Sequence, residues 1–252
     1  MFDLNGHVAL ISGGNGGIGL AFARGLAKCG ASLAIWGRNQ EKNKRAVDEL
    51  ISMGANAWSI ECDVTDKVQV SDSFAATVTQ FGTIDSCFAN AGASGPVQPF
   101  QTLTQEQWQS VMDINLTSVV YLYQCASAYW IEQQRGGKLI VTSSEAALIG
   151  MGYAAGYSAS KSAVMGLTRA LAVELGPRGI NVNAVLPGVV ETDLVEAQSD
   201  KFREAGLRRS CIGRIGNAED MEGVAVYLAS DHSNYMTGQG IVLDGGHSIF
   251  PM

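Results

Sequence analysis

The sequence predicts a single α/β domain with a central, mostly parallel sheet of seven strands, doubly wound with helices on both faces. Short apolar runs alternate along the chain with longer segments of helical period. The first apolar run leads into a glycine-rich turn that opens the first helical segment. The 252 residues, 46% of them hydrophobic, are enough to bury one core, and neither a linker nor an internal repeat divides them.

The expected strands are apolar runs that end at glycine, proline or polar residues. They comprise residues 7–11, 32–36, 56–62, 84–88, 138–142, 180–186 and 241–246. Helical patterns begin at Leu20 and near Asp66, and others cover residues 104–131, 153–175 and 217–230. The segment 104–131 opens with a capping-box pattern at Thr104.

Composition limits the function classes. A formal net charge of −7 and few basic clusters argue against nucleic acid or an anionic membrane as a partner. No stretch approaches about 18 consecutive apolar residues, and the amino terminus lacks a signal-peptide pattern, so we expect a cytoplasmic protein. The five cysteines form no CxxC pair and the three histidines lie far apart, so we expect no metal site.

The glycine-rich turn is a candidate phosphate-binding loop. Glycines allow the backbone to turn sharply and approach a pyrophosphate, and the free N–H groups of a new helix favour negative charge. The alternative is a turn that needs glycine only for its own geometry. The candidate contacts are Ser12, Gly13, Asn15, Gly16, Gly17, Ile18 and Gly19.

Tyr157 and Lys161 lie one helical turn apart, so their side chains share a face. A nearby cation favours the phenolate and is expected to lower the pKa of Tyr157, which would let the pair shuttle a proton. Ser144 follows the strand 138–142, at the edge where open α/β sheets bind ligands. Any helix can carry Tyr and Lys at this spacing by coincidence, so the pair alone does not establish chemistry.

Together these residues resemble the short-chain dehydrogenase/reductase family in its compact branch. The resemblance is carried by Ser144 thirteen residues before Tyr157, by Lys161, by Pro187-Gly188 and by the glycine turn, where Ser12 replaces the usual threonine. It covers nearly the whole chain and implies a Rossmann-type fold and a nicotinamide cofactor. It also implies hydride transfer between that cofactor and a ketone or secondary alcohol, because an enoyl-reductase variant would space Tyr and Lys differently.

The family resemblance implies four catalytic roles. Ser144 binds the substrate oxygen, Tyr157 transfers the proton, Lys161 lowers the tyrosine pKa and grips the nicotinamide ribose, and Asn115 completes the proton path through a water. For Asn115, a buried amide that holds two helices together is a second reading, compatible with the first.

The end of the second strand bears on the choice of cofactor. An acidic residue there accepts a hydrogen bond from the ribose of NAD, whereas an arginine can pair with the 2′-phosphate of NADP. Gly37 takes the acidic position and Arg38 follows, so NADP is favoured, with NAD the alternative if Arg38 only stacks on adenine or caps a helix. Asn15 weakens the case for NADP, because many NADP enzymes carry a basic residue at that position.

The resemblance implies further cofactor contacts at the ends of the other strands, and Tyr157 and Lys161 also belong to the cofactor site. These contacts are Asp63, Val64, Asn90, Ala91, Gly92, Pro187, Gly188, Val190 and Thr192. Either Asp63 or Thr65 can also start the helix near Asp66. Ala89 departs from the usual Asn-Asn-Ala-Gly.

A polar segment, residues 189–214, is expected to be a substrate-covering loop, with Leu194 to Cys211 over the substrate. Residues 94–99 and 145–153 are expected to line the mouth. Family members commonly pair the helices 104–131 and 153–175 between subunits, so we expect a homo-oligomer, a dimer or a tetramer.

Three functions remain open from the sequence. One is a small-alcohol, sugar or polyol dehydrogenase or carbonyl reductase acting on a small-molecule substrate. Another is reduction of a 3-oxoacyl thioester on an acidic carrier protein, for which six basic residues are candidates. A catalytically silent dinucleotide-binding scaffold is disfavoured by the intact Ser144, Tyr157 and Lys161. The six candidates are Arg135, Lys138, Lys201, Arg203, Arg208 and Arg209.

Overall fold

The computed structural model describes residues 2–192 and 200–249. Seven strands form one sheet in the order β3-β2-β1-β4-β5-β6-β7, and every neighbouring pair is parallel. The strands are β1 (Val8–Ser12), β2 (Ser32–Gly37), β3 (Ala57–Glu61), β4 (Ser86–Ala89), β5 (Gly137–Thr142), β6 (Ile180–Pro187) and β7 (Gly240–Leu243). The strand order reverses between β1 and β4, so the ligand crevice is expected beside the carboxyl ends of these two strands.

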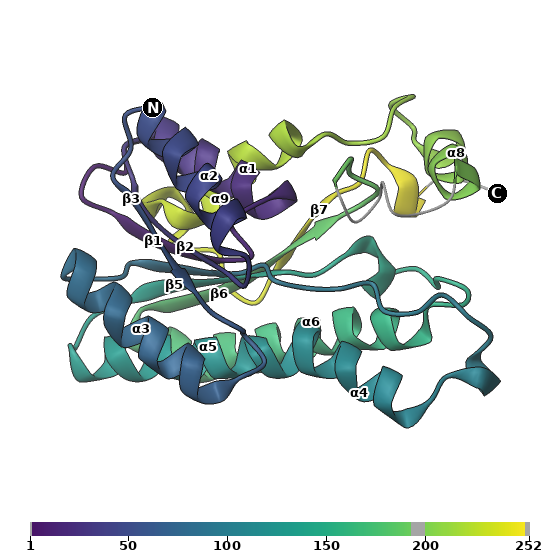
Figure 1. Ribbon diagram of the computed structural model, residues 1–252, viewed down its shortest axis with the longest axis horizontal. Helices are drawn as coiled ribbons and strands as arrows, with labels where there is room; N and C mark the ends of the chain where they lie inside the picture. Colours follow the sequence, from purple (N-terminus) through teal and green to yellow (C-terminus); the bar gives the residue numbers. More distant parts are fainter. Residues whose placement is uncertain (1, 193–199, 250–252) are drawn as a thin grey trace.

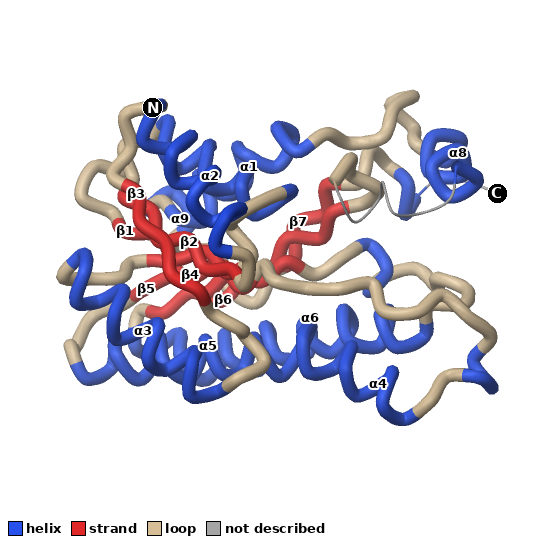
Figure 2. Tube along the Cα trace, viewed as in Figure 1, coloured by secondary structure: helices blue, strands red, loops and turns tan. Residues whose placement is uncertain are grey.

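Helices cover both faces of the sheet (Figures 1 and 2). On one face lie α1 (Gly17–Lys28), α2 (Gln40–Ser52) and α9 (Glu222–Ala229). On the other lie α3 (Lys67–Phe81), α4 (Gln105–Met112), α5 (Ser118–Glu132) and α6 (Ala155–Leu175). Two buried apolar clusters result, one on each face, which confirms the predicted doubly wound fold.

The segment expected as one helix, residues 104–131, is two α-helices joined by a π-helical turn, Asp113–Thr117. The predicted capping box is present, because Thr104 accepts a hydrogen bond from the Gln107 N–H and the Gln107 side chain accepts one from the Thr104 N–H. Single π turns inside α-helices often lie at functional sites. This turn carries Asn115.

Several predicted boundaries are wrong: the first helix begins at Gly17 and not at Leu20, and three others have a local cause. The helix expected from residue 153 begins at Ala155, because Tyr153 has a φ of 64°, a left-handed conformation that a bulky residue adopts only under constraint. The last strand ends at Leu243, since the Asp244 carboxylate accepts hydrogen bonds from the N–H groups of Gly246 and Ser248 in the turn that follows. The helix near Asp66 is capped by Asp66 itself and by neither Asp63 nor Thr65.

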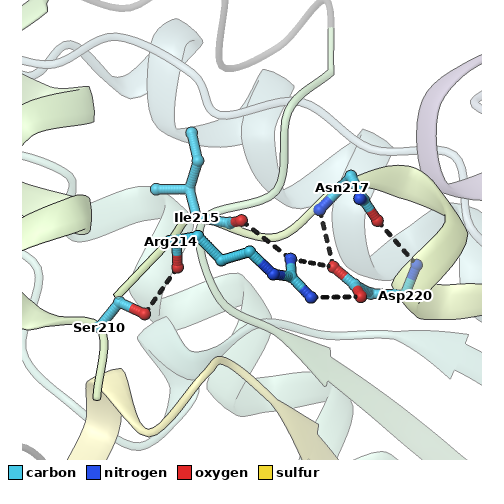
Figure 3. Close-up of polar contacts among 5 residues, drawn as sticks. All are labelled: Ser210, Arg214, Ile215, Asn217 and Asp220. Carbon is cyan, nitrogen blue, oxygen red and sulfur yellow. Dashed lines mark hydrogen bonds and ion pairs between the residues drawn. The ribbon is translucent and has the colours of Figure 1, made fainter. Parts of the chain in front are cut away.

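The expected substrate-covering loop contains a helix, α8 (Asp200–Arg209), and residues 193–199 of that segment lie outside the described residues. The segment returns to the core through a turn in which Arg214 makes two hydrogen bonds to the Asp220 carboxylate (Figure 3). Asn217 and Asp220 close a reciprocal cap on the 3-10 helix that precedes α9. This turn fixes the carboxyl end of the covering segment.

No helix in the described ranges is both long and apolar enough to cross a membrane.

Candidate active site

The glycine turn joins β1 to α1 beside the reversal of strand order. A Cβ on Gly13 would lie 3.0 Å from the Ala91 Cα, and one on Gly19 would lie 2.3 Å from the Gly13 carbonyl oxygen, so packing alone requires these two glycines. Gly16 differs, because a Cβ there would meet no heavy atom within 4 Å. No side chain caps the N-terminus of α1, so its first N–H groups have no side-chain acceptor. This arrangement suits a phosphate group.

A set of hydrogen bonds joins the carboxyl ends of β1, β4 and β5. The Ser12 hydroxyl accepts hydrogen bonds from the N–H groups of Asn90 (3.1 Å) and Ala91 (3.3 Å). The Asn90 amide donates to the Gly13 carbonyl (3.2 Å) and accepts from the Thr142 hydroxyl (2.9 Å). Asn90 therefore clamps the ends of these three strands together. The Ser12 hydroxyl serves the same purpose, which was not anticipated.

The end of β2 has a steric reason to lack an acidic residue. A Cβ on Gly37 would lie 2.3 Å from the Asn15 amide nitrogen and 2.6 Å from the Asn43 amide oxygen. These two amides bond to each other at 2.6 Å, and the Asn43 nitrogen also donates to the Gly37 carbonyl at 2.8 Å. Arg38 is exposed and lines an open cavity of about 610 Å³ with Thr65 and α4.

Asp63 lies close to Arg38 at the same end of the crevice. Burial raises the pKa of Asp63, but two hydrogen bonds from Thr65 and the charge of Arg38 outweigh that effect and hold the pKa below its ordinary value. Asp63 is therefore a carboxylate at neutral pH, and Val64 beside it is buried. The Asp63 carboxylate and the Arg38 guanidinium thus lie at the same end of the crevice.

Ser144, Tyr157 and Lys161 meet where β5 ends. Ser144 is 8% exposed and follows the strand in extended conformation, and Tyr157 lies in the first turn of α6. The Lys161 ammonium is 5.8 Å from the centre of the Tyr157 ring and donates a hydrogen bond of 2.7 Å to the Thr142 carbonyl. The sheet edge and the helix face therefore bring together the three residues that the sequence placed apart.

The expected lowering of the tyrosine pKa is wrong for this arrangement. Burial raises the pKa of the Tyr157 phenol, a hydrogen bond with Ser144 lowers it in part, and the negative charge of Glu145 raises it further. Burial also lowers the pKa of Lys161 to about 8. Because its ammonium is directed at Thr142, the lysine does not overcome the burial of the phenol.

Asn115 forms hydrogen bonds with the loop after β4 and with α6. Its amide nitrogen donates to the Ala93 carbonyl (2.9 Å) and to the Ser160 hydroxyl (3.0 Å), and its oxygen accepts from the Ala93 N–H (2.9 Å). A Cβ on Gly92 would lie 3.0 Å from the Asn115 oxygen and 3.4 Å from the Lys161 ammonium. Gly92 therefore leaves room for these two side chains. The hydrogen bonds of Asn115 hold the loop after β4 to α6, as the second reading of this residue expected.

Residues 188–192, which follow β6, pass beside the glycine turn. A Cβ on Gly17 would lie 3.2 Å from the Thr192 methyl group. The Thr192 hydroxyl donates to the Val190 carbonyl at 3.3 Å, and the Gly188 N–H donates to the end of β7. This segment therefore closes one side of the predicted phosphate site.

The predicted mouth segments lie together. The Gln98 N–H donates to the Tyr153 carbonyl at 2.9 Å, and a pocket between these segments includes Pro96, Phe100 and Tyr157. Tyr153 itself is 68% exposed. The wall beside Tyr157 is therefore largely apolar and aromatic.

Two of the basic residues proposed to receive a carrier protein are at the wrong end of the sheet. Arg135 and Lys138 lie at the start of β5, opposite Ser144. Arg135 pairs with Asp85, and Lys138 donates to Asn181 at 2.9 Å. Arg208 and Arg209 are exposed on α8.

Several residues of the site were missed in the sequence. Thr142 orients both Asn90 and Lys161, and Asn43 closes the end of β2. His247, near the described C-terminal end, lies 2.9 Å from Glu145. Hydroxyl and amide residues at strand ends were the available signal for Thr142, whereas nothing local indicated His247.

Known proteins resemble the chain over nearly its full length. The sequence model of a family described as Enoyl-(Acyl carrier protein) reductase matches residues 13–248. A 3-oxoacyl-[acyl-carrier-protein] reductase of Chlamydia pneumoniae is 33% identical over 96% of this chain and 97% of its own. A cyclohexanol dehydrogenase of Acinetobacter sp. (strain SE19) is 34% identical over 97% of this chain and 96% of its own.

Solved structures also match the fold over nearly the whole chain. A short-chain type dehydrogenase/reductase from Mycobacterium marinum superposes with a TM-score of 0.94 at 38% identity. The match covers 98% of this chain and 97% of that one.

Proposed function

Because the chain belongs to the short-chain dehydrogenase/reductase family, oxidoreductases acting on CH–OH groups, we propose that it interconverts a small secondary alcohol and a ketone, with Tyr157 transferring the proton. The observation that carries this proposal is the convergence of Ser144, Tyr157 and Lys161 at the end of β5. An acid–base group must lie within hydrogen-bond reach of the proton it moves, and a phenol beside a serine hydroxyl satisfies this for a substrate oxygen.

Each residue has a distinct task in this proposal. Ser144 holds the substrate oxygen, and Tyr157 donates a proton to it in ketone reduction or removes one in alcohol oxidation. Lys161 supplies a fixed positive charge beside the phenol, since the Thr142 carbonyl holds its ammonium in place. Asn115 keeps the π turn, the loop after β4 and α6 together, and in this proposal also holds the water of the proton path.

The family binds NAD or NADP, and when bound the nicotinamide supplies or accepts the hydride. The chain fits such a group, because Gly16 and the uncapped N-terminus of α1 leave space for a pyrophosphate. We propose NADP as the preferred form. Arg38 borders the open cavity, and Gly37 brings no carboxylate to the end of β2, where the Asn15 and Asn43 side chains crowd the position.

The apolar wall beside Tyr157 supports a small cyclic or branched ketone over a sugar or polyol. Hydroxyl-rich substrates need several buried hydrogen-bond partners, whereas the wall beside Tyr157 carries Pro96, Phe100, Leu103 and Val111, with Ser94, Gln98 and Tyr153 as its other polar side chains. The cyclohexanol dehydrogenase relative is named for a substrate of this kind.

A second candidate is reduction of a 3-oxoacyl thioester. The exposed Arg208 and Arg209 on α8 are the observation that favours it, since an acidic carrier could contact them. The relative from Chlamydia pneumoniae bears that name.

We also propose that the protein forms a homo-oligomer through α5 and α6. The outer face of α6 carries the small residues Gly166 and Ala170 and an 81% exposed Val173. Small residues allow close approach of a second helix pair.

A substrate panel tests the proposed function. Cyclic ketones, a polyol and a 3-oxoacyl thioester should each be assayed with NADPH and NADH, and the matching alcohols with the oxidised cofactors. Turnover of a cyclic ketone with the highest kcat/KM supports the proposal. Turnover of the thioester alone would assign the second candidate, and no turnover of any carbonyl compound would contradict both.

A further inference from the structure

A buried carboxylate and imidazole lie beside Ser144 and have no part in the reaction proposed above. Glu145 follows Ser144 directly, and His247 begins the C-terminal 3-10 turn after β7. His247 Nδ1 is 2.9 Å from Glu145 Oε2, and the side chains are only 12% and 10% exposed. The fold brings them together across 102 positions of sequence. We refer to them as the Glu145–His247 pair.

The turn that carries the imidazole is itself held on both sides. The Asp244 carboxylate accepts hydrogen bonds from the N–H groups of Gly246 (2.8 Å) and Ser248 (2.7 Å). The Cys211 N–H, just after α8, donates to the Gly245 carbonyl at 2.8 Å. The turn therefore connects the substrate-covering segment to the catalytic loop, by which we mean residues 143–147 after β5, and the Glu145–His247 hydrogen bond makes the contact with that loop.

Burial disfavours charge on both members of the pair. It raises the pKa of Glu145 to about 7, with the charge of Asp244 adding to the rise and Arg209 opposing it. Burial also lowers the pKa of His247, with Arg209 adding to the fall and Asp244 opposing it. Consequently the pair shares a single proton on the acidic side of neutrality and loses it near neutral pH. The charge of Glu145 also raises the pKa of Tyr157.

We propose that Glu145 and His247 are positioning residues: their buried hydrogen bond holds the C-terminal turn, and with it the substrate-covering segment, against the catalytic loop beside Ser144. This inference rests on the proposed role of Tyr157 in proton transfer. A carboxylate near a phenol disfavours the phenolate, so the tyrosine titrates at higher pH when Glu145 is charged. The pair would thereby link the pH of the medium to the pH range of catalysis.

Two substitutions separate the electrostatic role from the mechanical one. Glu145→Gln keeps a hydrogen-bonding group and removes the charge, so the alkaline limb of kcat/KM against pH should move to lower pH by about half a unit or more. His247→Leu removes the hydrogen bond and should raise the substrate KM several-fold, whereas His247→Asn, which keeps a polar atom near the Nδ1 position, should restore it. Glu49→Gln, at a carboxylate paired with Arg24, is the matched control and should leave the limb in place.

Histidine NMR provides a readout without turnover. The chain has only three histidines, so His247→Asn and His7→Asn identify the ring signals. In the wild type the midpoint of the His247 ring should lie below the ordinary histidine value, and in Glu145→Gln, which removes a neighbouring carboxylate, it should fall further. An unchanged midpoint together with an unmoved kcat/KM limb would overturn the inference. A shifted ring midpoint in a protein that reduces no carbonyl compound would support the pair and contradict the proposed function instead.

Discussion

The Lys161 ammonium donates a 2.7 Å hydrogen bond to the carbonyl oxygen of Thr142, the last residue of β5. In return, the hydroxyl of the next residue, Ser143, donates to the Lys161 carbonyl at 2.8 Å. These two bonds tie the catalytic helix to the sheet edge at the point where Ser144 follows. The lysine is therefore held in place although its burial disfavours its charge.

Lys161→Met should make the protein more stable near pH 6.5 while abolishing catalysis. Burial lowers the pKa of Lys161 from 10.5 to about 8, so its stabilising contribution is present above pH 10.5 and is lost as the pH falls through about 8. Removing the buried charge should raise the free energy of unfolding by about 1–3 kcal/mol, after allowing for the lost bond to Thr142. Urea unfolding at pH 6.5 and 9.5 measures this. A gain that does not shrink at pH 9.5 would contradict the explanation.

Tyr157→Phe should abolish turnover and leave cofactor binding intact. The substitution keeps the ring and removes the oxygen that moves the proton, and loss of a general acid–base group typically costs about 10²–10⁴-fold in rate. Fluorescence titration with cofactor and steady-state kinetics separate the two effects. Tyr153→Phe is the control, because its exposed phenol lies at the mouth and should leave kcat within a few-fold. Full activity of Tyr157→Phe on a ketone that the wild type reduces would remove the proposed mechanism.

Arg38→Asp should weaken NADP binding by about 1.5–3 kcal/mol, the usual size of a hydrogen bond to a charged group, and shift the preference toward NAD. The new carboxylate would repel the 2′-phosphate at the edge where Arg38 now stands. Isothermal titration with both cofactors measures the shift. A wild type that already binds NAD more tightly would show that Arg38 does not read the phosphate.

Gly37→Asp alone should fail to create an NAD enzyme. Its Cβ would lie 2.3 Å from the Asn15 amide, so the variant should lose thermal stability and bind both cofactors poorly. The double variant Gly37→Asp with Asn15→Gly removes that clash and leaves only the close contact with Asn43, so it should recover part of the lost stability and bind NAD better than NADP. The single variant Asn15→Gly is the control for loss of the Asn15–Asn43 bond. Tight NAD binding by the single variant Gly37→Asp would show that the Asn15 side chain moves aside at little cost.

In solution the molecular mass should be two or four times the 26.6 kDa of one chain. Replacing Ala170 on the outer face of α6 with Arg should shift the mass toward the monomer, because a charge there would be buried by a second helix pair. Multi-angle light scattering at micromolar concentration measures both. Lys44→Glu, on the exposed surface of α2, is the control and should not change the mass. A wild type that runs as a monomer would contradict the proposed oligomer.

The sequence by itself determined the features that depend on local pattern. The alternation of apolar runs and helical periods gives the doubly wound sheet, because burial on both faces requires that pattern. Spacing along one helix places Tyr157 and Lys161 on one face, and glycines after the first strand indicate a phosphate turn. These predictions need no knowledge of what lies across the crevice.

Tertiary structure alone decided the electrostatics and the long-range contacts. The pKa of Tyr157 rises because the surrounding protein buries the phenol, and the four-residue spacing to Lys161 does not reveal this. Likewise, the clash between position 37 and Asn15 appears only when the glycine turn packs against the end of β2. Glu145 and His247 meet because parallel strands place the ends of β5 and β7 at the same edge of the sheet. Contacts between distant segments depend on strand order and burial, which local sequence does not encode in any one stretch.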